Sequence, residues 1–205
     1  LNYNTAKASA WDDKQLLEFA HSLRHLTKPM IIAANKSDRP NSQENILKLK
    51  KEFPEMMIIP CAADSELALR EASKLQMIDY MPGDRNFKVI KVNEKQKSAL
   101  ETIKKNVLDV YGDTGVQEIL DSAVFKILNY IAVFPASPHK LTDSQGRILA
   151  DCFLVPQGTT ALEFAFKLHT DIGNNFVKAI DARTGKALGK DYKLKHRDGL
   201  EIITR

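Results

Sequence analysis

The sequence predicts a chain of mixed architecture, with a parallel α/β part, a helical spacer and an α+β module at the C-terminal end. Two short apolar segments, 30–34 and 56–60, alternate with helical patterns, which is the order of parallel α/β units. Two helical patterns then follow without a strand between them. From about Lys126, β-branched and aromatic segments surround a single helical pattern, which favours a mixed sheet. We therefore expect three parts, with these bounds: 1–83, 84–125 and 126–205.

The first helix is expected over residues 12–26, where leucine and phenylalanine recur at a helical spacing. Lys28 precedes Pro29, and the helix should end there because proline disfavours helix in the residue before it. After the first strand, Ser42 is a good N-cap for a second helix, which Pro54 closes. The second strand then completes a helix–strand–helix–strand order.

The first strand leads directly into Asn35-Lys36-Ser37-Asp38, which fits Asn-Lys-x-Asp, the guanine-reading motif of P-loop GTPases. An ionised carboxylate only accepts hydrogen bonds, so Asp38 can take both hydrogens that guanine presents at N1 and at its exocyclic amine. Asn35 can join neighbouring loops and reach the far edge of the purine. The methylene stem of Lys36 can lie over the base. The motif lies at the carboxyl end of a strand, where open α/β sheets bind ligands.

A loop of small residues, Cys61-Ala62-Ala63, follows the second strand. In P-loop GTPases a Ser-Ala-x loop at this place presents backbone N–H groups to guanine O6, and small residues let the backbone approach closely. Cys61 stands where serine is usual, and a thiol is a weaker donor. A tight strand-to-helix turn would use the same residues. Two such loops in this order favour a purine site built from Asn35, Lys36, Asp38, Cys61, Ala62 and Ala63.

The phosphate-binding loop Gly-x-x-x-x-Gly-Lys-Ser/Thr does not occur in the 205 residues. The segment 143–146 matches an Asp-x-x-Gly metal motif, but it lies after the base motif and a β-turn explains it. Gly185-Lys186 is a similar false match. The chain does not begin with Met, and we expect it to be the C-terminal half of a longer GTPase. We expect no catalytic residues here, GTP or GDP as the ligand, Mg²⁺ only with the missing half, and no GTP hydrolysis by the chain alone.

Three segments, KPMIIAANKSD, CAADSELALREA and IDYMPGD, resemble the archaeal branch of the Obg-related GTPases, close to the YchF group. YchF proteins prefer adenine, and the retained Asp38 implies guanine. The residues from VFPAS to the final EII resemble a TGS domain, which threonyl-tRNA synthetases, Obg-type GTPases and stringent-response enzymes share. The resemblance implies a partial P-loop GTPase sheet, then a ubiquitin-like β-grasp fold, and a role in translation through RNA or the ribosome.

The net charge of +4 lies in the C-terminal part. Residues 124–205 hold 12 Lys and Arg against 8 Asp and Glu, whereas residues 1–123 hold 18 of each. The densest basic run could neutralise RNA phosphates, with Tyr192 stacking on a base, or could merely solubilise loops. The run consists of Lys186, Lys190, Lys193, Lys195, His196 and Arg197.

Asn93 can cap a helix that runs to Tyr111 and ends at Gly112, and Thr114 can cap a second helix. His169-Thr170-Asp171 invites a metal reading, but a zinc site needs about four ligands, so a capping role is expected. No metal site is predicted.

The two cysteines, Cys61 and Cys152, lie far apart and suggest reduced thiols in a cytoplasmic protein. No apolar run approaches the roughly 20 residues that span a bilayer, so a membrane is not indicated as a partner. DNA is not indicated as a partner either. The alternative to a GTP-binding protein is a non-enzymatic RNA- or protein-binding module with a degenerate nucleotide half.

Overall fold

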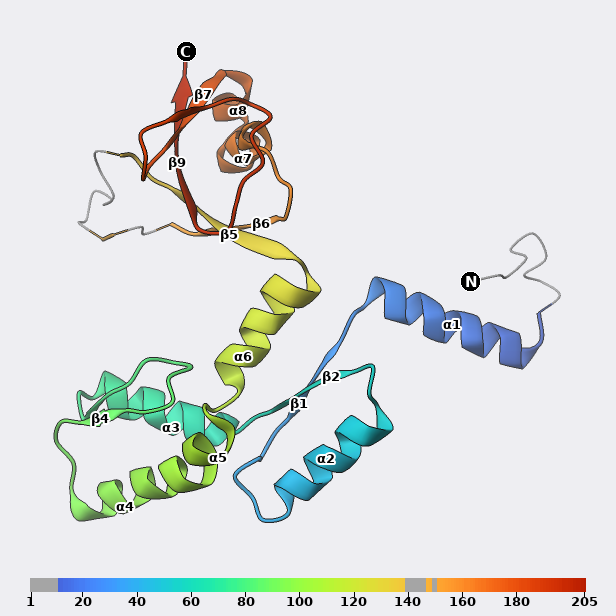
Figure 1. Cartoon of the computed structure of the whole chain (residues 1–205), viewed down its shortest axis with the longest axis vertical. Helices are drawn as coiled ribbons and strands as arrows, with labels where there is room; N and C mark the ends of the chain where they lie inside the picture. Colours follow the sequence, from blue (N-terminus) through green and yellow to red (C-terminus); the bar gives the residue numbers. More distant parts are fainter. Residues whose placement is uncertain (1–10, 139–146, 149–150) are drawn as a thin grey trace. The chain divides into compact units, whose positions relative to one another are not determined.

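Residues 11–138, 147–148 and 151–205 are described by the computed structural model of the chain (Figure 1). They fall into two units, Leu1–Leu120 and Asp121–Arg205. The expected turn at 143–146 and the first residue of an expected strand at 150–155 lie outside the described residues.

The first unit alternates helices and short strands before it becomes helical. Its elements are α1 (Asp13–Thr27), β1 (Ile31–Ala34), α2 (Ser42–Glu52), β2 (Met57–Pro60), α3 (Ala63–Lys74), β3 (Ile78–Asp79), β4 (Lys88–Val89), α4 (Glu94–Ile103), the π-helix η2 (Lys104–Leu108), α5 (Asp109–Tyr111) and α6 (Val116–Asp121). The predicted helix–strand–helix–strand order is confirmed. The start of α1 is fixed by a capping box, in which Asp12 and Gln15 each accept from the other's backbone N–H.

The strands β1 and β2 pair in parallel, from Ile31 opposite Met57 to Ala34 opposite Pro60. The parallel pair is the sheet element that the sequence predicts for this part. Ile58 and Ile59 in β2 are buried, whereas β1 is half-buried or exposed. A second, antiparallel pair joins β3 to β4 through Ile78 and Val89. Because β1 and β2 are parallel, their carboxyl ends meet at the same edge of the sheet.

The predicted spacer packs with the first unit. Asn93 caps α4 through a capping box with Gln96, and the helical run continues through η2 and α5 to Gly112, whose φ of +93° ends it in the left-handed region. The spacer and α3 share one core, which consists of Ala62, Leu69, Ala72, Ile78, Tyr80, Leu100, Val107 and Leu108. The N-cap role expected for Thr114 is wrong: its hydroxyl donates to Glu66 instead.

The second unit holds a five-stranded mixed sheet with strand order β6-β5-β9-β7-β8. Its elements are the π-helix η3 (Ser122–Ile127), β5 (Tyr130–Pro135), β6 (Phe153–Pro156), α7 (Ala161–Leu168), α8 (Thr170–Asn174), β7 (Phe176–Asp181), β8 (Ala187–Leu188) and β9 (Asp198–Thr204). The pairing of β5 with β9 is parallel, and the other pairs are antiparallel. The core gathers around Phe164, which is fully buried and meets Phe153 edge to face.

A capping role for His169 is confirmed. Its backbone is extended, so it ends α7, and its Nδ1 accepts a hydrogen bond from the N–H of Asp171 at 3.1 Å to begin α8. No group of three or more metal-ligating side chains occurs among the residues that the structure describes.

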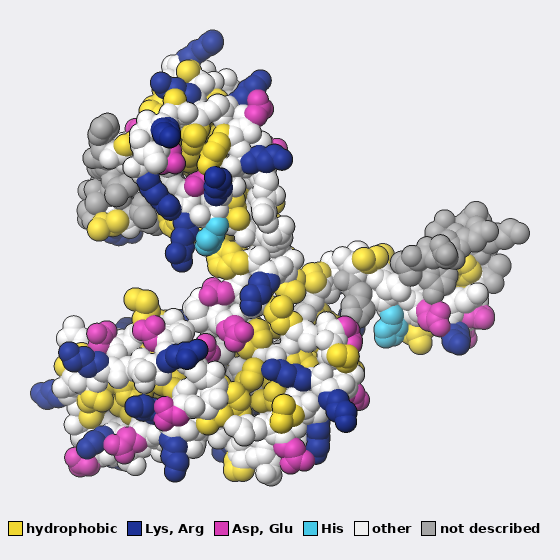
Figure 2. All heavy atoms as spheres, viewed as in Figure 1, with side chains coloured by type: hydrophobic (Ala, Val, Ile, Leu, Met, Phe, Trp, Pro, Cys, Tyr) yellow, Lys and Arg dark blue, Asp and Glu magenta, His cyan; other side chains and the backbone are white. Residues whose placement is uncertain are grey.

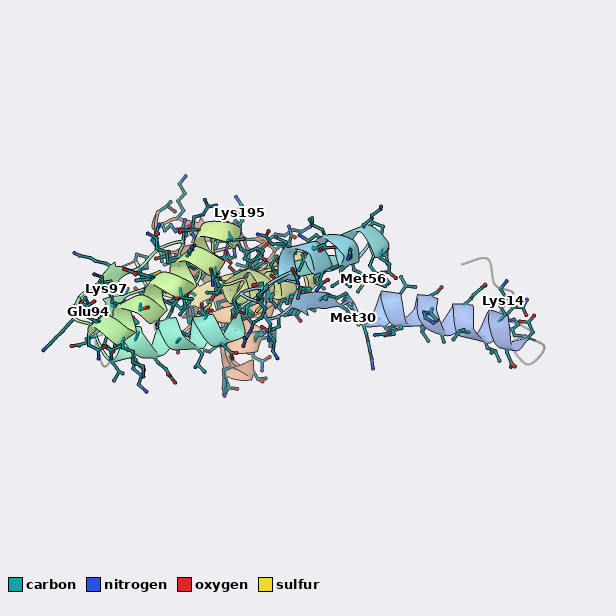
Figure 3. All side chains as sticks on the ribbon, turned by 90° about the horizontal axis from the view of Figure 1, so that it is seen from below. Lys14, Met30, Met56, Glu94, Lys97 and Lys195 are labelled. Carbon is teal, nitrogen blue, oxygen red and sulfur yellow. The ribbon has the colours of Figure 1, made fainter. Side chains whose placement is uncertain are left out.

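The surface carries mixed charge. Figure 2 shows acidic and basic side chains interspersed over the visible face of the first unit, and mostly basic ones on that of the second. Glu94 and Lys97 at the beginning of α4 are exposed, as is Lys195 in the second unit (Figure 3). None of the helices in the described ranges has both the length and the apolar composition for a membrane span.

Candidate functional site at the ends of β1 and β2

Two loops lie side by side because the strands before them are paired. We call residues 35–38, after β1, the first loop and residues 61–63, after β2, the second loop. The ladder continues beyond the strands, since the Cys61 N–H donates to the Ala34 carbonyl at 3.0 Å and the Ser37 N–H to the Cys61 carbonyl at 2.9 Å. The two predicted motifs therefore lie next to each other.

Asn35 joins the loops, as the sequence predicts. Its Oδ1 accepts hydrogen bonds from the N–H of Lys36 at 2.8 Å and of Ala63 at 3.2 Å. Lys36 itself has a φ of +63°, a left-handed conformation that is uncommon for a residue with a side chain and that tends to occur at functional sites. Its side chain is exposed.

Asp38 lines an open cleft of about 560 Å³ beside the first loop. Its side chain is 33% exposed, so a ligand can reach it. The carboxylate lies 3.6 Å from Nε of Arg39, which is the only ion pair it makes within the described residues. One side of the cleft is the chain from Ser37 to Glu44, and the other is the helical run, which contributes Lys105, Asn106, Val110 and Tyr111. The π-helix η2 supplies Lys105 and Asn106, and π-helical turns are frequent at functional sites.

Ser37 also lines this cleft, but its hydroxyl is buried. It is 3% exposed, and its Oγ has no hydrogen-bond partner in the part of the chain that the structure describes. The Ser37 carbonyl, in contrast, accepts two hydrogen bonds, from Oγ of Ser42 at 2.6 Å and from the Tyr111 hydroxyl at 3.3 Å. A buried hydroxyl without a partner costs free energy.

The second loop differs from expectation, because its backbone donors are not free. The N–H of Ala62 donates to the Thr114 carbonyl at 2.9 Å, and that of Ala63 donates to Asn35. The free donors lie one step further on: α3 begins at Ala63 without a side-chain cap, and the N–H groups of Asp64 and Ser65 have no acceptor among the described residues. Small side chains at 61–63 predict a close backbone approach, but the approaching group is the protein's own.

The Cys61 side chain is buried beneath the second loop. It is 4% exposed, and its pKa is raised, first by burial and then by the negative charges of Glu66 and Asp113. The thiol is therefore neutral at ordinary pH. It stands inside the fold where the sequence comparison with P-loop GTPases places a serine hydroxyl.

Glu66 is a buried acid that the motif search did not single out. It is 3% exposed, and its carboxylate accepts from the hydroxyls of Thr114 at 2.6 Å and Tyr80 at 2.7 Å and from Nε of Arg70 at 2.5 Å. Burial raises the pKa of Glu66, but these hydrogen bonds outweigh it and the pKa is lowered, so the group is ionised. Burial and the Glu66 charge raise the pKa of Tyr80, which stays a donor. The sequence signal that could have identified Glu66 is its position three residues before the buried Leu69, which places it on the core face of α3.

The basic run of the second unit is exposed but extends along the connections before β8 and β9. Lys186, Lys190, Lys193, Lys195 and Arg197 are all exposed and have no acidic partner among the described residues. Lys195 and His196 line a pocket of about 490 Å³, together with Phe125 and Tyr130. Tyr192, the expected stacking residue, packs against the core, and its hydroxyl lies 3.3 Å from Asp198.

Comparison with known proteins places these features in a family. Residues 33–137, which include both loops, match the Obg-like GTPase YGR210-like, G4 motif-containing domain, and this is half of the chain. The chain belongs to the YGR210-like family of Obg-like GTPases. Residues 140–204 of this YGR210-like chain match the TGS domain. Both resemblances predicted from the sequence are thereby confirmed.

The YGR210-like chain also has curated and solved relatives. It is 44% identical to an uncharacterized GTP-binding protein of Methanocaldococcus jannaschii over 198 residues, and these aligned residues cover 95% of the chain and 50% of that protein. An uncharacterized GTP-binding protein of Schizosaccharomyces pombe is 31% identical over 74% of the chain and 39% of its own length. The crystal structure of a GTP binding protein from Pyrococcus horikoshii OT3 matches with a TM-score of 0.70 and 38% identity, over 95% of this chain and 51% of that one. The chain spans about half the length of these relatives or less.

Proposed function

We propose that the first unit reads the base of a guanine nucleotide, GTP or GDP, and that Asp38 is the reading carboxylate. The observation that carries the proposal is the paired arrangement of the two loops: Asn35 joins them, and Asp38 lines the cleft beside them. Asp38 would accept from N1–H and the exocyclic amine of guanine, a pair of donors that adenine lacks. The exposed stem of Lys36 would cover one face of the ring.

Guanine O6 needs a donor, and the beginning of α3, rather than the second loop itself, would supply it. Because the N–H groups of Ala62 and Ala63 are occupied, the first free N–H groups of α3, on Asp64 and Ser65, are the donors that suit an acceptor oxygen. Cys61 and Ala62, both buried, would then serve as support for the base site rather than as direct contacts.

A single substitution tests the reading carboxylate. In Asp38→Asn the side chain accepts one hydrogen bond and donates one, which suits the N1–H and the C2 carbonyl of xanthine instead of the two donors of guanine. We expect affinity for GDP to fall by at least about 100-fold and affinity for xanthosine diphosphate to rise, because two charge-assisted hydrogen bonds are lost. Calorimetry on the longest natural protein that contains these residues measures both, with the exposed Asp79→Asn as the control. Equal affinity of wild type and Asp38→Asn for GDP would refute the proposal.

Hydrolysis of GTP and binding of Mg²⁺ are proposed only for a protein that also holds a phosphate-binding loop. That loop cradles the phosphates and supplies the hydroxyl that binds the metal, and it is not in the 205 residues. We expect the proposed parallel GTPase sheet to include β1 and β2. Of the parts of a GTPase site, we propose only base reading for this chain.

We further propose that the second unit, as a β-grasp TGS domain, contacts RNA or a ribosomal surface in the cytoplasm. Its support is the excess of exposed lysine and arginine without acidic partners. If these side chains bind phosphates, log affinity for RNA falls linearly with log salt concentration, and replacing Lys193 and Lys195 by Gln should reduce that slope by about 2. Fluorescence anisotropy with a labelled RNA measures the slope, and an unchanged slope would contradict phosphate contact.

A second candidate is a binding module whose nucleotide half no longer binds. The occupied N–H groups of Ala62 and Ala63 and the pairing of Asp38 with Arg39 favour it. The two candidates differ in the calorimetry above: a non-binding half gives no heat with GDP, xanthosine diphosphate or ADP in wild type or in Asp38→Asn.

A further inference from the structure

One short turn contacts both loops of the candidate site. We call residues 111–115, at the end of α5, the bridging turn. At its beginning, the Tyr111 hydroxyl donates to the Ser37 carbonyl at 3.3 Å and lies 3.3 Å from Oγ of Ser42. Near its end, the Thr114 carbonyl accepts the Ala62 N–H at 2.9 Å. The bridging turn therefore spans from the first loop to the second.

Thr114 is held in place by the buried carboxylate. It is 1% exposed, and its Oγ1 donates to Glu66 at 2.6 Å. Glu66 belongs to α3, the helix that begins in the second loop, and Tyr80 and Arg70 fix its two oxygens. A hydrogen bond to an ionised group is worth more than a neutral one, so the hydroxyl–carboxylate contact fixes the position of the Thr114 carbonyl.

The backbone of the bridging turn also presses directly on the end of β2. Gly115 has a φ of +77°, and a Cβ placed on it would lie 1.8 Å from the Pro60 carbonyl oxygen and 3.1 Å from Cα of Cys61. Only glycine fits such an approach. The Asp113 carboxylate accepts the Gly115 N–H at 2.6 Å and shapes the turn. The bridging turn therefore packs closely against the backbone just before the second loop.

We propose that Tyr111, Thr114 and Glu66 are positioning residues for base reading, which set the separation of the first loop from the second. The inference rests on the proposed guanine site. Glu66 acts through Thr114 on Ala62, and neither Glu66 nor Thr114 lines the cleft. Tyr111 lines the cleft, and its positioning role is the hydrogen bond to the Ser37 carbonyl. A flat ring needs a slot of fixed width, and reading groups must be held to within about half an ångström to work.

The test compares nucleotides that differ only at the base. GDP and inosine diphosphate have the same phosphates, and inosine lacks the exocyclic amine that Asp38 would read, so the ratio of their affinities reports base reading alone. We expect Tyr111→Phe and Thr114→Val each to lower this ratio about three- to tenfold, the range of one hydrogen bond. Thr114→Ser keeps the hydroxyl and should restore the ratio. Thr102→Val removes a hydroxyl that only contacts the Ser98 carbonyl within α4, so it is the matched control.

The outcomes separate the inference from the function. Calorimetry is done on the longest natural protein that contains these residues, with folding checked by circular dichroism. If the ratio in both variants equals that of wild type while Asp38→Asn still loses GDP, the inference is wrong and the guanine site stands. If wild type binds ADP as well as GDP, both fall. Should Thr114→Val not fold, Tyr111→Phe, which removes one oxygen from a half-buried ring, decides the question by itself.

Discussion

Gly115→Ala tests the close approach of the bridging turn to the end of β2. An alanine Cβ would lie 1.8 Å from the Pro60 carbonyl oxygen, about 1.2 Å short of the 3.0 Å that real Cβ atoms keep. The opposing atoms belong to the backbone and cannot rotate away. We estimate a loss of about 1–2 kcal/mol in the free energy of unfolding for the left-handed conformation, and a further loss of about 1–3 kcal/mol for the overlap.

Gly112→Ala is the matched control in the same unit. Gly112 also has a left-handed φ, of +93°, but its added Cβ would meet only the Arg85 side chain, at 3.6 Å. It should therefore lose the first contribution and not the second. The two variants should differ by about 1–3 kcal/mol, which corresponds to roughly 4–12 °C in Tm for a unit of this size.

Two measurements follow the first unit specifically. Thermal unfolding by circular dichroism reports both units together, so hydrogen exchange at the amides of α3 identifies the transition that belongs to the first. We expect α3 to lose protection in Gly115→Ala and to keep most of it in Gly112→Ala. Equal losses of stability in the two variants would refute the close packing of the bridging turn against the end of β2.

Four further predictions concern Asp38, Glu66, Cys61 and GTP hydrolysis by the chain alone. Arg39→Ala removes the cation that pairs with Asp38 and should raise affinity for GDP about two- to fivefold at low salt, an effect that calorimetry at about 1 M salt should no longer detect. The lowered pKa of Glu66 means that its contribution to stability is present above about pH 4.5 and is lost as the pH falls through the folded-state pKa; urea unfolding from pH 6 to pH 3 should show a steeper loss in wild type than in Glu66→Gln. Cys61, buried and with a raised pKa, should resist iodoacetamide at pH 7.5 until the protein unfolds, whereas the exposed Cys152 should react at once, as mass spectrometry can show. The purified 205-residue chain should release no phosphate from GTP above the buffer rate in a malachite green assay.

The order of elements was predictable because local patterns decide it. The apolar runs before Asn35 and before Cys61 are short and bounded by turn residues, and they form the parallel pair β1 and β2. Asn93 and Gly112 mark the ends of the spacer run by the same local rules of capping. The link between the loops through Asn35 followed from placing two motifs at neighbouring strand ends.

The N-cap role expected for Ser42 is wrong for a local reason: Ser42 is already the first residue of α2, Asn41 precedes it as the N-cap, and the Ser42 hydroxyl donates to the Ser37 carbonyl. The other wrong expectations concern partners that are distant in the sequence. Thr114 has a good local reason to cap a helix, but a carboxylate 48 residues earlier takes its hydroxyl. Ala62 is small enough for a close approach, but no local pattern says whether a ligand or the chain itself approaches. Glu66 could have been noticed as an acid on the apolar face of α3, although its three donors come from separate segments.

The buried carboxylate gives a physical reason why the proposed base site would depend on the spacer. Taking an ionised group out of water costs several kcal/mol, and hydrogen bonds compensate for this cost only if their geometry is good. Glu66 meets the requirement with donors from α3 itself, from the chain after β3 and from the bridging turn. An apolar side chain in its place could hold the core equally well but would leave Thr114 free to shift, and the carbonyl on Ala62 would shift with it. Burying the Glu66 charge therefore costs free energy, but its hydrogen bond fixes the position of Thr114. This combination is expected where a fixed geometry matters more than stability.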